Sequence, residues 1–152
     1  MKSLVRSSVL TAIISVAIMS CNSGGSGTKI NVGDAKIDVK NAGTEWASAT
    51  LLSKFGLDGM SKPQGFSDGV IAENTIQGES QLFIQYTGNA ASAAALKSYF
   101  TDKGWEQVQA LSANNVTVTV YEKEANNMVY RVHINEIEGN IQLAATKKPK
   151  EE

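Results

Sequence analysis

The stretch Gln81–Trp105, QLFIQYTGNAASAAALKSYFTDKGW, decides the fold because a strand pattern changes into a helix pattern within it. Its first seven residues alternate so that Leu82, Ile84 and Tyr86 share one face, as in a half-buried strand. After a break at Gly88 the apolar spacing becomes three to four residues, which is the period of a helix. A strand that leads directly into a helix predicts that the helix packs on the sheet to which the strand belongs.

This helix has signals at both of its ends. Asn89 can cap the first turn, and Gly104 stands where a residue in the left-handed region commonly ends a helix. We therefore expect a helix over Ala90–Lys103, with Trp105 folded back behind its end. The apolar stripe of the helix consists of Ala93, Leu96 and Phe100.

Further strands lie on both sides of this unit. Val70–Ile76 precedes it, with a turn at Gly78, and Glu106–Leu111 is an additional strand candidate behind it. Three more strands follow, separated by turns at residues 126–127 and 138–140, where Asn and Gly tolerate positive φ. Their alternating apolar positions are Val116, Val118 and Val120, then Met128, Tyr130, Val132 and Ile134, then Ile141 and Leu143.

The segment before Val70 is less regular. Alternation between Ile30 and Val39 predicts a short hairpin with its turn at residues 33–34. Thr44 can cap a helix that ends at Gly56. Residues 57–69 contain three glycines and a proline, which indicates an irregular connection, and its length makes it a candidate binding loop.

These elements predict an α+β fold: an antiparallel β-sheet with one or two amphipathic helices packed on one face and polar side chains on the other. We expect a single domain over residues 29–146, followed by a charged, disordered tail at 147–152. The order of elements over residues 70–146 resembles the small domains of many bacterial lipoproteins in general pattern. That resemblance implies no particular reaction.

A leader precedes the domain. The stretch Val9–Cys21, VLTAIISVAIMSC, follows a basic start that carries Lys2 and Arg6, and it is too short to span a bilayer, so it is typical of a secretory signal peptide. Its last four residues, Ile18-Met19-Ser20-Cys21, resemble the lipobox of bacterial lipoproteins. The resemblance implies that residues 1–20 are a signal peptide cut after Ser20 and that Cys21 carries acyl chains. The lipid bilayer would then be a partner through acylated Cys21.

The composition after the leader agrees with a lipid-anchored protein. Residues 21–28 begin with the only cysteine of the chain and continue as a Gly- and Ser-rich flexible tether. Without Lys2 and Arg6 the chain has 12 basic against 15 acidic residues, which is not the basic footprint of a nucleic-acid-binding protein. Asn22, rather than Asp, follows the cysteine, and the enterobacterial sorting rule then implies the outer membrane, facing the periplasm or the surface.

Few residues could carry chemistry. His133 is the only histidine and falls beside Arg131 and Asn135 on the polar side of its strand, so we expect a solvated side chain with a pKa near the ordinary value of about 6.5. Glu136 and Glu138 could share a strand face as paired carboxylates, but ordinary surface charge explains them better. We predict no catalytic, cofactor-binding or metal-binding residue.

Two functions remain open. The first is a membrane-anchored envelope lipoprotein that works as a non-enzymatic binding or structural module, with a protein or small ligand on the exposed sheet face or on the loop at 57–69. The alternative is a small envelope hydrolase or transferase whose site consists of acids and hydroxyls. A single His and a single Cys remove the commonest nucleophile systems, which favours the first. We expect a monomer, because the core comes from the chain's own elements.

Overall fold

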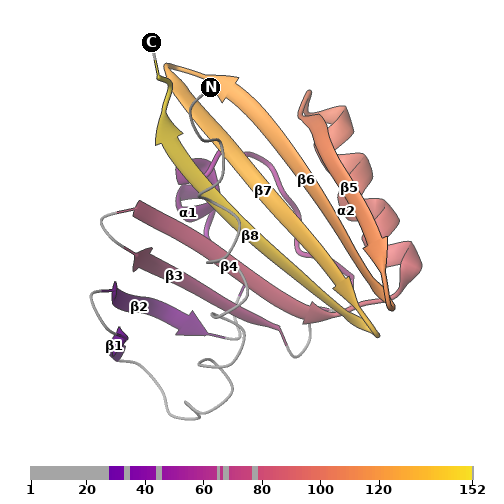
Figure 1. Cartoon of the computed structure of the whole chain (residues 1–152), viewed down its shortest axis with the longest axis horizontal. Helices are drawn as coiled ribbons and strands as arrows, with labels where there is room; N and C mark the ends of the chain where they lie inside the picture. Colours follow the sequence, from indigo (N-terminus) through magenta and orange to yellow (C-terminus); the bar gives the residue numbers. More distant parts are fainter. Residues whose placement is uncertain are drawn as a thin grey trace, which may run out of the picture.

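The computed structural model describes residues 28–32, 35–43, 46–64, 66, 69–76 and 79–151 of the 152-residue chain. These residues form an eight-stranded antiparallel sheet and two helices (Figure 1). The α+β class predicted from the sequence is confirmed, and most of the domain is sheet. The elements in chain order are β1 (Thr28–Val32), β2 (Ala35–Gly43), α1 (Ala49–Lys54), β3 (Val70–Ile76), β4 (Glu79–Thr87), α2 (Ala90–Asp102), β5 (Glu106–Ala113), β6 (Val116–Ala125), β7 (Met128–Ile137) and β8 (Asn140–Pro149).

One long connection organises the sheet. The strand order is β1-β2-β3-β4-β8-β7-β6-β5, so β4 lies beside the last strand of the chain and not beside the next one. Helix α2 carries the chain from β4 to the far edge, where β5 begins, and three hairpin-connected strands lead back until β8 pairs with β4. The meander predicted after Trp105 is therefore present. The two edge strands of the sheet are β1 and β5.

Helix α2 forms as its sequence predicts. The Asn89 side chain accepts a hydrogen bond from the Ser92 amide at 3.0 Å, and Gly104 adopts φ +72° just after the helix. The Trp105 amide donates to the Phe100 carbonyl at 2.9 Å, which folds the chain back at this end. The helix ends at Asp102, one residue before the expected end, and it buries the predicted stripe of Ala93, Leu96 and Phe100.

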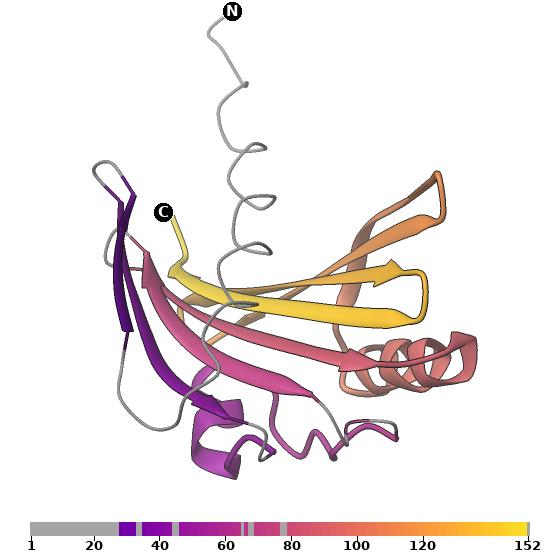
Figure 2. The ribbon, with the colours of Figure 1, turned by 90° about the horizontal axis from the view of Figure 1, so that it is seen from below.

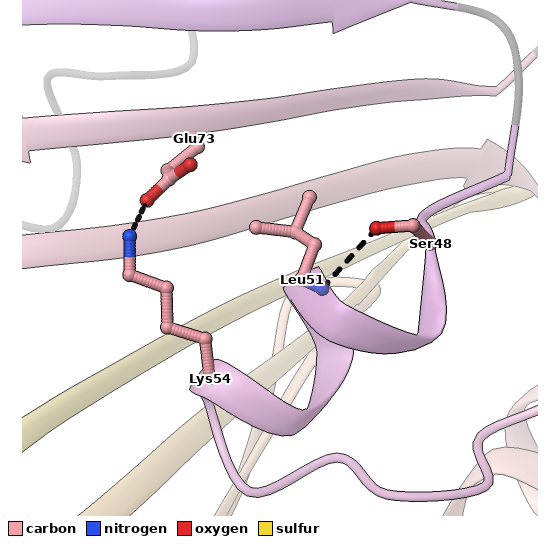
Figure 3. A network of polar contacts seen from close by, with 4 residues as sticks. All are labelled: Ser48, Leu51, Lys54 and Glu73. Atoms are coloured by element: carbon pink, nitrogen blue, oxygen red, sulfur yellow. Dashed lines mark hydrogen bonds and ion pairs between the residues drawn. The ribbon is translucent and has the colours of Figure 1, made fainter.

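Helix α1 is shorter than predicted. It begins at Ala49, because Ser48 and not Thr44 is its cap: Ser48 is extended, and its hydroxyl accepts a hydrogen bond from the Leu51 amide at 3.2 Å (Figure 3). Thr44 lies outside the described residues. Lys54 in the last turn forms an ion pair with Glu73 of β3, as Figure 3 also shows, and this pair ties the helix to the sheet.

The core lies between the sheet and the helices. Both helices lie on the same side of the sheet in Figure 2. The predicted strand face of Leu82, Ile84 and Tyr86 is buried there, and it packs in one cluster with residues of both helices. Strands β8, β7 and β6 contribute Ile141, Leu143, Ala145, Val132, Ile134 and Tyr121 to the same cluster.

The C-terminal tail continues the sheet, so the disorder expected for 147–152 is wrong for its first part. Strand β8 extends to Pro149, which lies opposite Met128 at the start of β7. The Lys150 amide then donates to the Asn127 carbonyl at 2.8 Å, and the Lys150 side chain pairs with Glu124. The charged side chains belong to an ordered strand because β7 supplies ladder partners over its whole length. The predicted hairpin at the N-terminal end is present as β1 and β2, while its turn at residues 33–34 lies outside the described residues.

Candidate functional site

The predicted lipid-attachment residue cannot be placed. Cys21 and the leader at residues 1–20 lie outside the described residues, as does the greater part of the tether at 21–28. The lipid anchor therefore stays a prediction. Within the described ranges, neither helix has the length and apolar character needed to cross a membrane.

The face of the sheet that the helices leave uncovered has a regular construction. We call this surface, on strands β3 to β8, the outer face. Directly paired residues form a row across five strands at its centre, and each of the four pairs joins an apolar residue to His133 or to an alanine. This central row consists of Ala72, Phe83, Ala144, His133 and Val120. Apart from His133, every member of the row is buried, with at most 7% exposure.

Polar rows flank this apolar row on both sides. One row consists of Asn74, Gln81, Thr146, Arg131 and Glu122. The other consists of Val70, Gln85, Gln142, Asn135 and Val118. The expectation of a simply polar second face is therefore wrong. The valines of β6 point to this side, because Thr119 and Tyr121 take the helix side of that strand.

His133 occupies the middle of the outer face and differs from its prediction. It is half-buried, and its direct cross-strand neighbours are the apolar residues Ala144 and Val120. Desolvation by this burial lowers the pKa of His133 below its ordinary value; Arg131 lowers it further, and Glu122 acts in the opposite direction. The expected solvated side chain with an ordinary pKa is thus wrong, because the row around the ring is apolar.

Two amides on the same face have unused hydrogen-bonding groups. The side chain of Asn74 is 1% exposed, and within the described part of the chain neither its oxygen nor its nitrogen has a hydrogen-bond partner. Gln81, its direct partner on β4, has an unpaired side-chain oxygen. On the other flank, Gln142 donates to Gln85 at 3.4 Å. Buried amides without partners are uncommon in folded proteins, which makes this end of the outer face a place where a bound group could be accommodated.

Glu136 and Glu138 do not form a pair of carboxylates, in agreement with the preferred interpretation of them as separate surface charges. Glu136 lies on the helix side and forms an ion pair with Lys97 of α2. Glu138 lies beyond the end of β7, in the turn at φ +27°, and accepts a hydrogen bond from Asn115 at 3.1 Å. Burial first, and Glu136 second, raise the pKa of Tyr86 to about 12, so this phenol stays protonated at neutral pH. A protonated phenol supplies no base, and the buried Tyr86 hydroxyl has no hydrogen-bond partner in the described part of the chain.

The candidate binding loop at residues 57–69 uses its apolar side chains for packing. Leu57, Met60 and Phe66 are buried in the core cluster, and the Phe66 ring meets Trp46 edge-on with centroids 5.1 Å apart. The Tyr99 hydroxyl of α2 donates to the Asp58 carbonyl at 3.0 Å. The loop is therefore attached to α2 and to the core at several points, whereas the polar groups of the outer face lie on the side of the sheet away from both helices.

The described residues contain no group of three or more His, Cys, Asp or Glu side chains placed to hold a metal ion. Comparisons with models of known families, with curated proteins and with solved structures found no match for this chain. We therefore infer a function from the outer face. The polar side chains of its flanking rows, together with His133, can donate and accept hydrogen bonds.

Sequence reasoning missed the central row, although a signal for it exists. Leu82-Phe83-Ile84 and Leu143-Ala144-Ala145 are continuous apolar runs, which indicate strands buried on both faces. A strict alternation would have placed polar residues at Phe83 and Ala144. The polar partners Asn74 and Gln81 have no such signal, because their juxtaposition depends on the register between β3 and β4.

Proposed function

We propose that this chain is a membrane-anchored envelope lipoprotein, lipidated at Cys21, whose domain is a non-enzymatic binding module. The outer face binds the ligand, which is a small molecule or an extended part of another envelope protein. The observation that carries this assignment is the arrangement of that face: a buried apolar row that contains His133, between two rows rich in amide side chains.

The chemistry of the outer face suits binding better than catalysis. The flanking rows contain neutral amides and one ion pair, Arg131 with Glu122, so they present many hydrogen-bonding groups with little net charge. Apolar surface together with a few placed polar groups is the usual composition of a ligand site. His133 has no nucleophile beside it in its row, and a lowered pKa keeps it neutral, so it can act as a donor and an acceptor.

The anchor is tested by labelling with a fatty-acid probe and by mass spectrometry of the mature chain. We expect wild-type protein to begin at Cys21 and to carry acyl chains, and Cys21→Ser to lose the label and to remain as an uncut precursor. Protease treatment of intact cells then separates a periplasmic domain from a surface domain. A mature protein with an unmodified Cys21 would contradict the anchor and leave the binding proposal standing.

The binding surface is tested by a photoreactive amino acid placed at single positions in living cells. Gln142 reports on the outer face, Lys62 on the loop at 57–69, and Ala94, which is exposed on α2, is the matched control. We expect a discrete adduct from position 142 that is absent from position 94. Adducts from position 62 alone would move the site to the loop, and equal adducts from 142 and 94 would overturn the proposal.

A further inference from the structure

The edge strand β5 has features that differ from those of the other sheet edge. It runs for eight residues, EQVQALSA, and every residue in it is exposed. Val108 and Leu111 are two of the three exposed large apolar residues in the described part of the chain, at 46% and 58% exposure. The opposite edge, β1, is five residues long and carries Lys29. Short strands, charged residues and β-bulges protect sheet edges from pairing. The register of β5 shifts between Gln107 and Gln109, but from Gln109 to Ala113 the strand pairs regularly with β6 and carries no charge.

The backbone of an edge strand restricts what can cover it. β5 pairs with β6 on one side only, so the donors and acceptors along its other side have no partner strand in this sheet. A partner that satisfies them must itself be an extended strand. Figure 1 shows β5 at the edge of the sheet, with α2 behind it and no described strand beside it.

We propose that a second copy of this chain covers this edge, by antiparallel pairing of β5 with β5. A two-fold axis perpendicular to the sheet, centred on Leu111, places Leu111 directly opposite Leu111 of the second copy. The neighbouring pairs are then Ala110 with Ser112 and Gln109 with Ala113. All these side chains are small or uncharged, so no like charges meet across the junction, and Glu106 lies beyond the end of the opposing β5.

This register also joins apolar surface from both copies. Leu111 is the cross-strand partner of Val118 on β6, on the outer face. The two-fold axis keeps both outer faces on the same side, so Val118 and Leu111 of one copy continue into Leu111 and Val118 of the other. The dimer thereby covers Leu111, the most exposed apolar side chain of this edge, which is in contact with water in the monomer. The dimer departs from the monomer expected from the sequence, and it does not depend on the ligand of the outer face.

The first test is a disulfide across the proposed axis in the full, membrane-inserted chain. Directly opposite residues in an antiparallel pair have Cα atoms about 4.5–5.5 Å apart, which lies within the range that a disulfide spans. We expect Leu111→Cys to give a dimer on a non-reducing gel. Ser98→Cys, on the exposed side of α2, and the wild-type chain, which has Cys21 alone, should not. Equal dimer yields from Leu111→Cys and from Ser98→Cys would overturn the proposal.

The second test is independent of crosslinking. The mass of the full chain in detergent, measured by sedimentation, should be that of a dimer for wild type and of a monomer for Leu111→Lys, because two lysines would then meet at the axis. Ile137→Lys is the matched control: it adds the same charge at the third exposed apolar position, two strands away from the edge. It should remain dimeric. Circular dichroism establishes that both variants are folded. A monomeric wild type, or a Leu111→Lys variant that stays dimeric, would contradict β5 pairing.

Discussion

On the helix-covered face, Phe100 stacks on Tyr121 with ring centroids 5.0 Å apart and meets Trp105 edge-on at 5.2 Å. On the outer face, Phe83 stands between two alanines, Ala72 and Ala144. Both phenylalanines are buried, but the first is held by other aromatic rings and the second by small residues. The difference indicates that contacts between large rings hold the helix-covered face together, whereas the ring on the outer face has small cross-strand neighbours.

The largest effect should come from the helix-covered face. Phe100→Ala removes a fully buried ring and its three aromatic contacts, and we expect a loss of about 3–5 kcal/mol in the free energy of unfolding. Phe83→Ala is the matched change on the outer face, and it should cost less, because Phe83 has alanines and not aromatic rings as its cross-strand neighbours. Urea unfolding followed by the fluorescence of Trp46 and Trp105 measures both variants. Equal losses would remove the distinction between the two faces.

The loop at 57–69 belongs to the helix-covered side, and Gly69 tests this. A Cβ atom at Gly69 would lie 2.3 Å from the Phe66 ring, which is itself buried and cannot move freely. Gly69→Ala should therefore cost about 1–3 kcal/mol through overpacking. The double variant with Phe66→Leu should show less than the sum of the two single losses, because the smaller side chain relieves the clash. Strict additivity would mean that the loop is not packed in this way.

The ion pair between Lys97 and Glu136 should contribute less. Both side chains are partly exposed, at 32% and 25%, so solvent screens their attraction. We expect Glu136→Gln to lower the free energy of unfolding by about 1 kcal/mol or less and to shift the pKa of Tyr86 downward, because Glu136 contributes to raising it. Ultraviolet titration of the tyrosines measures the second effect. An unchanged tyrosine titration would show that Glu136 does not contribute to the raised pKa of Tyr86.

The smallest effect should come from the centre of the outer face. We expect His133→Gln to change stability by no more than about 0.5 kcal/mol at pH 7, because amide and neutral imidazole are both polar donors and acceptors. The wild-type protein and the His133→Gln variant should differ in how their stability depends on pH. The pKa of His133 is lowered in the folded state, so its contribution is complete above the unfolded value of about 6.5 and declines as the pH falls through the folded pKa.

The advantage of wild type over His133→Gln should therefore become smaller, or change sign, between pH 7 and pH 5. Measuring both proteins over the same range cancels the titration of the carboxyl groups. A stability difference that stays constant with pH would show that His133 is solvated after all.

The sequence predicts elements that depend on local signals better than elements that depend on contacts between distant parts of the chain. Helix α2 could be predicted nearly to the residue, because its cap at Asn89, its stripe and Gly104 are local signals. The start of α1 was missed because Ser48 and Thr44 are both residue types that commonly cap a helix, and the structure has Ser48 as the cap. The sequence did not predict that β8 continues beyond Thr146. This extension depends on pairing with the start of β7, and the charged residues of the tail give no signal for it.

The candidate site was predictable only as a general location. The alternation in β7 placed Arg131, His133 and Asn135 on one face, and the structure keeps them there. The environment of His133 could not be predicted, because Ala144 and Val120 come from strands whose register is set by long-range pairing. Glu136 and Glu138 do not share a face because Glu138 lies in the turn predicted at residues 138–140, where it adopts φ +27°.

The division of the sheet into a core face and a binding face is tested most directly at two neighbouring residues of β8. Leu143 is fully buried on the helix-covered face, and Gln142 lies in a polar row of the outer face. We expect Leu143→Gln to lower the free energy of unfolding by at least about 3 kcal/mol, because it adds a buried polar group and removes core contacts. Gln142→Leu should change it by no more than about 0.5 kcal/mol. Comparable losses from both substitutions would contradict the division of the sheet into two faces.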